Sequence, residues 1–302
     1  MPVAPQPNFF IVGGPKCGTT ALYSYLRNHP QIFMCPIKEP QFFASDILGH
    51  QRRIQTLPEY LDCFRDAGKK KSIGEASTAY LGSRVAASEI KVFSPYAQII
   101  VMLRNPVDVM YAQHSERVFS NVEHILDFEA ALNSKEIRRW RSGPFKNQAM
   151  IRLEYRELSR FAEQVQRYFD VFGRERVHVI IYDDFKIDTS SVLRGVLNFL
   201  GVTSDYQTPL RVFNANRRAR SMAVQDFLRH PPKGLRSFAR MVLPDNLRSG
   251  LVECVRKLNI LYEPRPPLNH TLRERLQKEL EPEVEQLSCI LGRDLGAWCS
   301  GI

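Results

Sequence analysis

The sequence has 302 residues, of which 44% are hydrophobic and 25% are charged, values that are typical of a globular domain and exclude a disordered or collagen-like chain. Lys and Arg total 42 against 32 Asp and Glu, and the resulting net charge of +10 favours an anionic ligand such as a nucleotide, an acidic glycan or nucleic acid. The six cysteines form no CxxC pair and no Cys/His cluster, so the sequence predicts neither a disulfide framework nor a zinc site.

Membrane and export signals are absent from the sequence. No apolar run approaches the roughly 20 residues of a membrane-spanning helix, and the first residues lack a basic region followed by a long apolar one. We therefore expect no membrane span and no signal peptide, which makes a cytoplasmic protein the default expectation. We also expect one domain over residues 1–302, with its core from about residue 9 to residue 299.

Apolar runs and helical spacing predict the elements. Strands are expected at residues 8–12, which run into a Gly-Gly-Pro turn, and at the continuous apolar runs 99–103 and 177–182, which are typical of a parallel sheet buried on both faces. Helices are expected over residues 19–28, 107–119, 152–172, 189–200 and 272–291. The last two end before glycines suited to a helix C-terminus. This alternation predicts a single α/β domain in which a central parallel sheet is flanked by helices.

The strongest local signal is GGPKCGTT at residues 13–20, between the first strand and the first helix. Glycines let the backbone approach an anion, and the helix N-terminus offers free N–H groups and the positive end of its dipole. A lysine and two threonines add further donors. The loop therefore predicts a phosphate-binding site formed by Pro15, Lys16, Cys17, Gly18, Thr19 and Thr20.

This loop differs from the Walker A loop of kinases and ATPases, because Lys16 precedes Gly18 by two residues instead of directly following a glycine. Magnesium-dependent NTPases also need an Asp at the end of a later strand. Here the run 99–103 ends in Arg104. An arginine at that place favours a nucleotide held by cationic side chains, and we expect no metal at the site.

Four motifs together resemble the sulfotransferases that use 3′-phosphoadenosine 5′-phosphosulfate (PAPS). PKCGTT is similar to their 5′-phosphosulfate loop, and RNPVD at residues 104–108 resembles the opening of their 3′-phosphate motif. KEPQFF at residues 38–43, and GRDL at residues 292–295 with Trp298, are similar to segments of the bacterial and heparan-sulfate-type branch. The resemblance implies a PAPS-dependent sulfotransferase with a P-loop-like phosphosulfate-binding loop.

The resemblance also implies the catalytic roles. Lys16 would stabilise the leaving phosphate during in-line transfer without metal, and Glu39 would accept the proton of the attacking hydroxyl. Glu39 could instead be a structural residue paired with Lys38. His114 is the second candidate base, whereas Gln41, which stands where many relatives have His, cannot act as a base.

Further residues are implied to bind the nucleotide. Arg104 would bind the 3′-phosphate, although the Ser that relatives have eight residues on is Ala112 here. In relatives, a basic residue folds over the nucleotide, and Arg220 is the best match to it here. Arg220 belongs to a cluster with Arg211, Arg217 and Arg218. Alternatively, this cluster is a solvated basic loop with no ligand. The cluster belongs to residues 213–267, a basic, loop-rich segment that we expect over the cofactor and acceptor cleft.

Two more stretches could contribute to the acceptor cleft. Ser77 and Tyr80 match residues that line this cleft in relatives. Residues 138–141, Arg-Arg-Trp-Arg, could bind an anionic sugar or form a solvated helix face.

The leading functional hypothesis is transfer of a sulfuryl group from PAPS to a hydroxyl or amine, which leaves adenosine 3′,5′-bisphosphate. The acceptor could be a carbohydrate, a polyketide or lipid hydroxyl, or a small alcohol or phenol. The alternatives are a non-catalytic protein that binds nucleotide or nucleic acid through its positive charge, and a P-loop kinase of small molecules. We expect no nucleic-acid partner, since no DNA- or RNA-binding motif occurs. The oligomeric state cannot be derived from the sequence.

Overall fold

The computed structural model of the protein describes residues 5–134, 155–205, 217–229, 250, 254–255 and 257–300. Its central sheet consists of five parallel strands: β1 (Phe9–Gly13), β2 (Ile32–Met34), β3 (Ser72–Ala76), β4 (Gln98–Leu103) and β5 (Val177–Ile181). Their order across the sheet is β2-β3-β1-β4-β5. The chain therefore starts in the middle of the sheet and winds outward on both sides, which confirms the predicted parallel α/β fold.

Burial of the central strands explains their apolar sequences. Phe10 of β1 pairs with Glu75 of β3 on one side and with Ile99 of β4 on the other. Every residue of β1 and β3 is buried, as are all residues of β4 after the first. Strands in the middle of a parallel sheet have both faces covered, so they read as continuous apolar runs instead of alternating ones.

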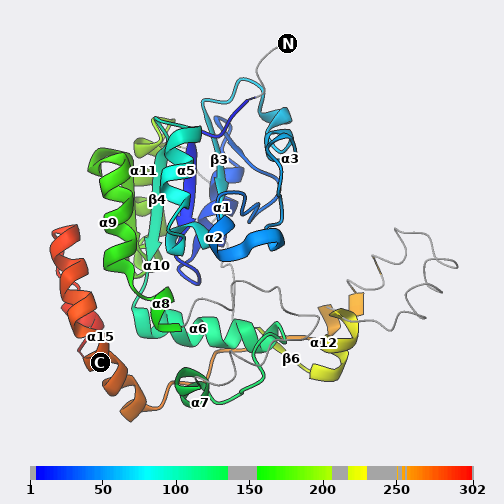
Figure 1. Cartoon of the computed structure of the whole chain (residues 1–302), viewed down its shortest axis with the longest axis vertical. Coiled ribbons are helices and arrows are strands. Elements are labelled where there is room, and N and C mark those ends of the chain that lie inside the picture. Colours follow the sequence, from blue (N-terminus) through cyan, green and yellow to red (C-terminus); the bar gives the residue numbers. More distant parts are fainter. Residues whose placement is uncertain are drawn as a thin grey trace, which may run out of the picture.

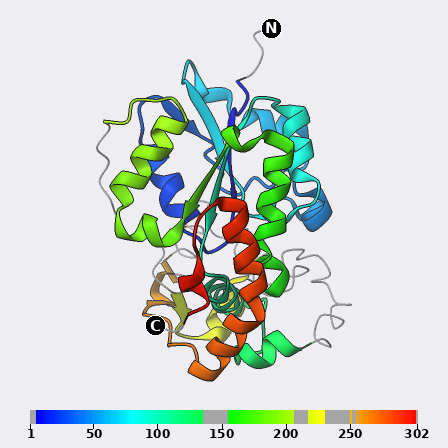
Figure 2. The same ribbon diagram turned by 90° about the vertical axis from the view of Figure 1, so that its left-hand side faces the viewer.

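Helices cover both faces of the sheet (Figure 2). One face carries α1 (Thr19–Arg27), α10 (Tyr182–Ile187) and α11 (Thr189–Phe199). The other carries α5 (Ala86–Phe93) and α9 (Phe161–Phe172), with the shorter α2 (Ser45–Leu48), α3 (Leu57–Asp62) and α4 (Ala79–Gly82) nearby. The long α6 (Pro106–Phe119) crosses beneath the carboxyl ends of the strands (Figure 1), where ligands bind in open α/β sheets.

The rest of the described chain surrounds α6 (Figure 1). Helices α7 (Phe128–Asn133) and α8 (Tyr155–Leu158) contact it, and α15 (His270–Leu291) packs against both α6 and α9. In the predicted basic segment, β6 (Arg217–Ala219) and β7 (Ile260–Tyr262) pair antiparallel, with α12 (Met222–Arg229) after β6. Since β6 contacts α6, this segment reaches the carboxyl edge of the sheet. Among the described helices, none is long and apolar enough to cross a membrane.

The structure departs from the predicted elements in several places, and helices such as α3, α5 and α7 were not predicted. The helix expected over residues 152–172 is two helices, α8 and α9, because the backbone of Arg160 between them is not helical (φ −78°, ψ 64°). Residues 152–154 lie outside the described part. The third strand ends one residue early, since Tyr182 begins α10. Strands β2 and β3 were not predicted, because β2 has three residues and β3 contains Gly74 and Glu75.

Candidate active site

The predicted phosphate loop connects β1 to α1 at the carboxyl edge of the sheet. Gly18 precedes α1 with a φ of +93° and offers no side-chain cap, so the first amides of the helix remain available to an anion. A Cβ atom at Gly18 would come within 3.0 Å of Cδ2 of Tyr182. Glycine is therefore required here both by the left-handed backbone and by the close approach of Tyr182.

The side chains of the loop divide between the interior and the surface. Pro15 and Cys17 are buried, and the Cys17 thiol donates to the Pro15 carbonyl at 3.3 Å. Burial raises the pKa of the Cys17 thiol to about 12, so the thiol is neutral. Cys17 can therefore contribute only its backbone groups to a ligand. Thr19 is buried and Thr20 is partly exposed. Lys16, with a left-handed φ of +61°, is partly exposed.

The ammonium group of Lys16 is paired with a carboxylate on α6. Nζ of Lys16 donates to Oε2 of Glu116 at 3.1 Å. The sequence analysis did not identify Glu116 as part of the site. This contact joins the loop to the helix that follows Arg104, so the two strongest cationic candidates share one region.

Arg104 and the loop both lie against Tyr182. The guanidinium carbon of Arg104 is 4.9 Å from the ring centre of Tyr182, the residue that Gly18 approaches. Nη2 of Arg104 also donates to Oδ2 of Asp108 at 3.3 Å, and Arg273 donates to the other oxygen of Asp108 at 2.6 Å. Tyr182 thus connects the loop to Arg104, and the sequence analysis placed it in a strand instead of the site.

A second guanidinium group, that of Arg265, is bonded to the same helix as Arg104. Nε of Arg265 donates to the Ser115 hydroxyl at 2.8 Å, and Arg265 lies over the ring of Tyr111. Burial is the main cause of the lowered pKa of Arg265, followed by the positive charge of Arg104. The sequence analysis missed Arg265 because it lies 150 residues from Ser115 in an irregular segment.

Ala112 stands on α6 at the position where relatives have a serine. Ala112 is 1% exposed and carries no hydroxyl. Ser115, about one helical turn further along α6, supplies one next to Arg265. Position 112 thus has no hydroxyl, whereas the Ser115 hydroxyl is bonded to Arg265.

Glu39 lies in a constrained turn after β2. Its Oε2 accepts from the Thr78 amide at 2.8 Å, and its Oε1 accepts from the Thr78 hydroxyl at 3.2 Å and from the Lys38 ammonium at 2.8 Å. The pairing with Lys38 that we considered as a structural alternative is therefore present. A partly exposed carboxylate held by two donors of Thr78 can also accept a proton, so the geometry is compatible with both roles.

His114 is not placed as a base. It is 4% exposed, and its Nε2 lies 2.8 Å from the Ile125 carbonyl. Its ring packs against Phe128 and Tyr155, and burial lowers its pKa. His114 is therefore a core residue of the contact between α6 and α7, which removes it as the alternative to Glu39.

The expectation that Ser77 and Tyr80 line the cleft is wrong. Both are fully buried, with 0% exposure, because both hydroxyls donate to the carboxylate of Glu75 inside the protein. Glu75 itself was not considered in the sequence analysis. It is fully buried, and burial raises its pKa to about 7.

Arg220 stays a prediction. It is exposed and its backbone amide donates to the Asn259 carbonyl at 2.8 Å, at the end of β6. Arg218 is also exposed and pairs with Glu263. Arg211 and residues 138–141 lie outside the described residues, and only the backbone of Arg217 is described.

The C-terminal motif at residues 292–298 contacts the residues that follow Arg104 and Tyr182. The Trp298 indole donates to Asp183 at 2.9 Å, and the Trp298 carbonyl accepts from the Asn105 side chain at 3.0 Å. Arg293 forms an ion pair with Asp184. Trp298 therefore links the residue after Arg104 to the residue after Tyr182, which gives this motif a structural role.

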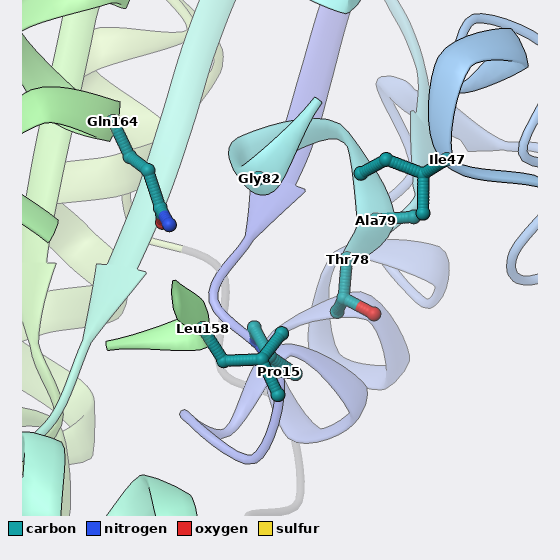
Figure 3. A pocket seen from close by; sticks show the side chains of 7 residues that line it. All are labelled: Pro15, Ile47, Thr78, Ala79, Gly82, Leu158 and Gln164. Carbon is teal, nitrogen blue, oxygen red and sulfur yellow. The ribbon is translucent and has the colours of Figure 1, made fainter. Parts of the chain in front are cut away.

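A small, mostly apolar pocket lies behind the loop (Figure 3). It is lined by Pro15 of the loop, Ile47 of α2, Thr78, Ala79 and Gly82 at α4, Leu158 of α8 and Gln164 of α9. Pro15 precedes Lys16, and Thr78 holds Glu39. Pro15 therefore contributes an apolar surface of the loop to this pocket.

The protein is thus a parallel α/β fold with a glycine loop and Arg104 at the carboxyl edge of its sheet, where ligands bind in open α/β sheets. The sulfotransferase domain family model matches residues 6–226, more than two thirds of the chain, and the chain belongs to this family.

The similar proteins are sulfotransferases from animals and bacteria. Human carbohydrate sulfotransferase 15 is 26% identical over 268 residues, and the alignment covers 71% of this chain and 47% of the human protein. Mouse bifunctional heparan sulfate N-deacetylase/N-sulfotransferase 4 is 26% identical over 294 residues, covering 90% of this chain and 32% of its own. The crystal structure of a sulfotransferase from Alicyclobacillus acidocaldarius is 28% identical, covers 98% of this chain and 100% of its own, and has a TM-score of 0.72. The chain thus spans less than half the length of these two curated relatives.

Proposed function

We propose that this protein transfers the sulfuryl group of PAPS to a hydroxyl or amine of an acceptor. The observation that carries the proposal is that Lys16, Arg104 and Arg265 each bond to a side chain of α6, the helix beneath the carboxyl edge of the sheet. Membership of the sulfotransferase family supports it. The S–O bond to the 5′-phosphate breaks, a new S–O or S–N bond to the acceptor forms, and the acceptor proton leaves.

Lys16 is the residue proposed to stabilise the leaving group. Sulfuryl transfer, like phosphoryl transfer, places growing negative charge on the leaving phosphate oxygen. The ammonium of Lys16 and the free amides at the start of α1 can meet this charge. Because cationic side chains supply the compensation, the proposed reaction requires no metal, and activity should persist in EDTA.

The two arginines are proposed to bind the 3′-phosphate that distinguishes PAPS from ATP-like nucleotides. Arg104 and Arg265 lie close enough for the charge of one to lower the pKa of the other. A dianionic phosphate between two guanidinium groups relieves this repulsion, and each fork can form two hydrogen bonds. Arg220 is proposed as a further nucleotide contact.

Glu39 is the proposed general base. The Thr78 amide and hydroxyl fix its carboxylate, which orients it for proton acceptance. For the acceptor, we place carbohydrates first, because the names of the relatives include carbohydrate and heparan sulfate sulfotransferases. Polyketide or lipid hydroxyls, small alcohols and phenols are the other classes to be tested.

Two measurements test the proposal. The first measures the thermal unfolding temperature of the protein in the presence of adenosine 3′,5′-bisphosphate, of ADP with Mg²⁺, or of a DNA oligonucleotide. We expect only adenosine 3′,5′-bisphosphate to raise it. Radiolabelled PAPS is then supplied, with and without EDTA, together with amino-sugar glycans, hydroxy fatty acids, cyclohexanol and 4-nitrophenol. Stabilisation by ADP with Mg²⁺ would indicate a kinase, and stabilisation by the oligonucleotide would indicate a nucleic-acid-binding protein.

A further inference from the structure

A buried carboxylate lies directly behind the segment that carries Glu39. Glu75 of β3 is 0% exposed and accepts three hydroxyl groups. Its Oε1 accepts from Tyr60 at 2.9 Å and from Tyr80 at 2.8 Å, and its Oε2 accepts from Ser77 at 2.8 Å. Such a cluster requires an explanation, because a carboxylate in the core is costly even when it is hydrogen-bonded.

Two of these hydroxyls also hold the backbone of the segment 39–43. The Ser77 hydroxyl accepts from the Gln41 amide at 3.0 Å, and the Tyr80 hydroxyl accepts from the Phe43 amide at 3.3 Å. Each hydroxyl therefore bridges the Glu75 carboxylate to one backbone amide. Because the hydroxyl donates to the carboxylate, its oxygen is oriented to accept from the amide.

The segment needs such support because of its backbone conformation. Glu39 has a φ of +62° and Gln41 a φ of +63°, left-handed values that residues with side chains adopt only when their surroundings hold them there. The Glu39 amide donates to the Ala76 carbonyl at 2.9 Å. Residues of β3 and of the segment after it thus hold the backbone of residues 39–43 through hydrogen bonds.

Glu75 cannot contact the acceptor directly, because it is fully buried. We propose that Glu75 is a positioning residue for the reaction, which acts through Ser77 and Tyr80 to hold residues 39–43 and so to orient the Glu39 carboxylate. This inference rests on the proposed role of Glu39 as the general base. Its effect is expected on the catalytic step, because none of these residues contacts the loop at residues 13–20 through a hydrogen bond that the structure describes.

Tyr60 offers a matched comparison with Tyr80. Both are buried tyrosines that donate to the same oxygen of Glu75. The Tyr60 hydroxyl has no hydrogen bond to residues 39–43 among the described residues, whereas the Tyr80 hydroxyl accepts from Phe43. Replacing each by Phe removes the same bond to Glu75 and keeps both rings, so the difference between the two variants isolates the bridge.

The test measures kcat in the full chain with PAPS and the aliphatic acceptor that reacts fastest in the screen above, and nucleotide affinity by calorimetry with adenosine 3′,5′-bisphosphate. We expect Tyr80→Phe and Ser77→Ala to lower kcat about tenfold or more, as misplacement of a catalytic group does, with nucleotide affinity changed less than twofold. Tyr60→Phe should lower kcat less than about threefold. In a Glu39→Gln background, Ser77→Ala should add almost nothing, because it acts through the residue already removed.

The outcomes separate this inference from the proposed function. If Ser77→Ala and Tyr80→Phe keep full activity while Glu39→Gln has a lowered kcat, the positioning role of Glu75 is overturned. The proposed role of Glu39 as the general base then still holds. An additive loss in the Glu39→Gln background also overturns the positioning role. Full activity of Glu39→Gln overturns the base and this inference together. Ser77→Ala removes a single hydroxyl and so provides the test if Tyr80→Phe does not fold.

A second readout does not depend on the acceptor. Hydrogen exchange, followed in a peptide that covers residues 39–43, should be about tenfold faster in Ser77→Ala and Tyr80→Phe than in the unmodified protein and in Tyr60→Phe. Unchanged exchange in the first two variants would mean that the hydroxyl bridges do not hold the segment, and would overturn the inference.

Discussion

The ammonium group of Lys16 lies 3.1 Å from the carboxylate of Glu116, although the two residues are 100 positions apart in the sequence. Both side chains are about a quarter exposed, so the pair is accessible to solvent and to a ligand. A phosphosulfate bound at the loop would compete with Glu116 for Lys16 and would be repelled by the carboxylate. Glu116 therefore opposes binding of the anion that we propose Lys16 to bind.

Glu116→Gln should consequently tighten the binding of adenosine 3′,5′-bisphosphate. A partly exposed ion pair contributes up to about 1 kcal/mol, which corresponds to roughly fivefold in the dissociation constant. The gain should shrink at high salt, because such charges are screened. Calorimetry at two salt concentrations measures it, with Glu175→Gln at the opposite edge of the sheet as the control. Weaker binding in Glu116→Gln would show that the carboxylate instead holds Lys16 in its binding orientation.

Lys16→Ala should lower kcat much more than it weakens nucleotide binding. The charge of Lys16 matters most while the bond to the leaving phosphate breaks, so its removal raises the barrier. We expect a loss on the order of 10²-fold or more, as for removal of an oxyanion donor. Steady-state kinetics with PAPS measures it. Lys91→Ala on α5, whose ammonium lies over the Phe172 ring, is the control and should keep normal turnover. Near-normal turnover of Lys16→Ala would contradict the proposed mechanism.

Arg104→Ala and Arg265→Ala should both reduce the preference for a 3′-phosphate. Each lost charge-assisted contact costs roughly 1.5–3 kcal/mol, or about 10–150-fold in affinity. Affinity for adenosine 5′-phosphate, which lacks the 3′ group, should fall much less. Calorimetry with both nucleotides gives the ratio, and Arg275→Ala, whose guanidinium pairs with Glu129, serves as the control. Equal losses for the two nucleotides would place the arginines elsewhere on the ligand.

Strands β1, β4 and β5 and the loop were predictable from the sequence, whereas strands β2 and β3 and the partners of the loop were not. Continuous apolar runs are a local signal, and they predicted β4 and the position of Arg104 at its end. Glycine spacing likewise placed Lys16 at the start of α1. Glu116, Tyr182 and Arg265 reach the site through tertiary packing, and no local pattern marks them.

The same limit explains two errors. Ser77 and Tyr80 were expected at a cleft because a short sequence motif does not indicate which of its side chains face the core. Their hydroxyls point to Glu75, a residue of a short strand that the sequence analysis did not predict. His114 was considered as a base from its position alone, and only the packing of α6 against α7 shows it to be buried.

The stability of the protein should depend on pH through Glu75. Burial, the largest cause, raises the pKa of Glu75 from its ordinary value of 4.5 to about 7. The hydroxyls of Tyr80, Ser77 and Tyr60 lower this pKa, and the nearby charge of Glu39 raises it further. Between about pH 4.5 and pH 7 the folded protein holds a proton that the unfolded chain has released. The stabilisation linked to this proton is therefore complete below about pH 4.5 and is lost as the pH rises through about 7.

Glu75→Gln removes this titration and should flatten the dependence. The free energy of unfolding of the variant, relative to the unmodified protein, should rise by up to about 3 kcal/mol between pH 4.5 and pH 8, since each pKa unit corresponds to about 1.4 kcal/mol. Denaturant unfolding at several pH values measures the difference. His114 and His178, whose pKa values burial lowers, remain in both proteins, so their titration cancels. Glu285→Gln removes an exposed carboxylate from α15 and serves as the control. A difference between Glu75→Gln and the unmodified protein that stays constant from pH 5 to pH 8 would show that Glu75 is already ionised throughout this range, held so by its three hydroxyl donors.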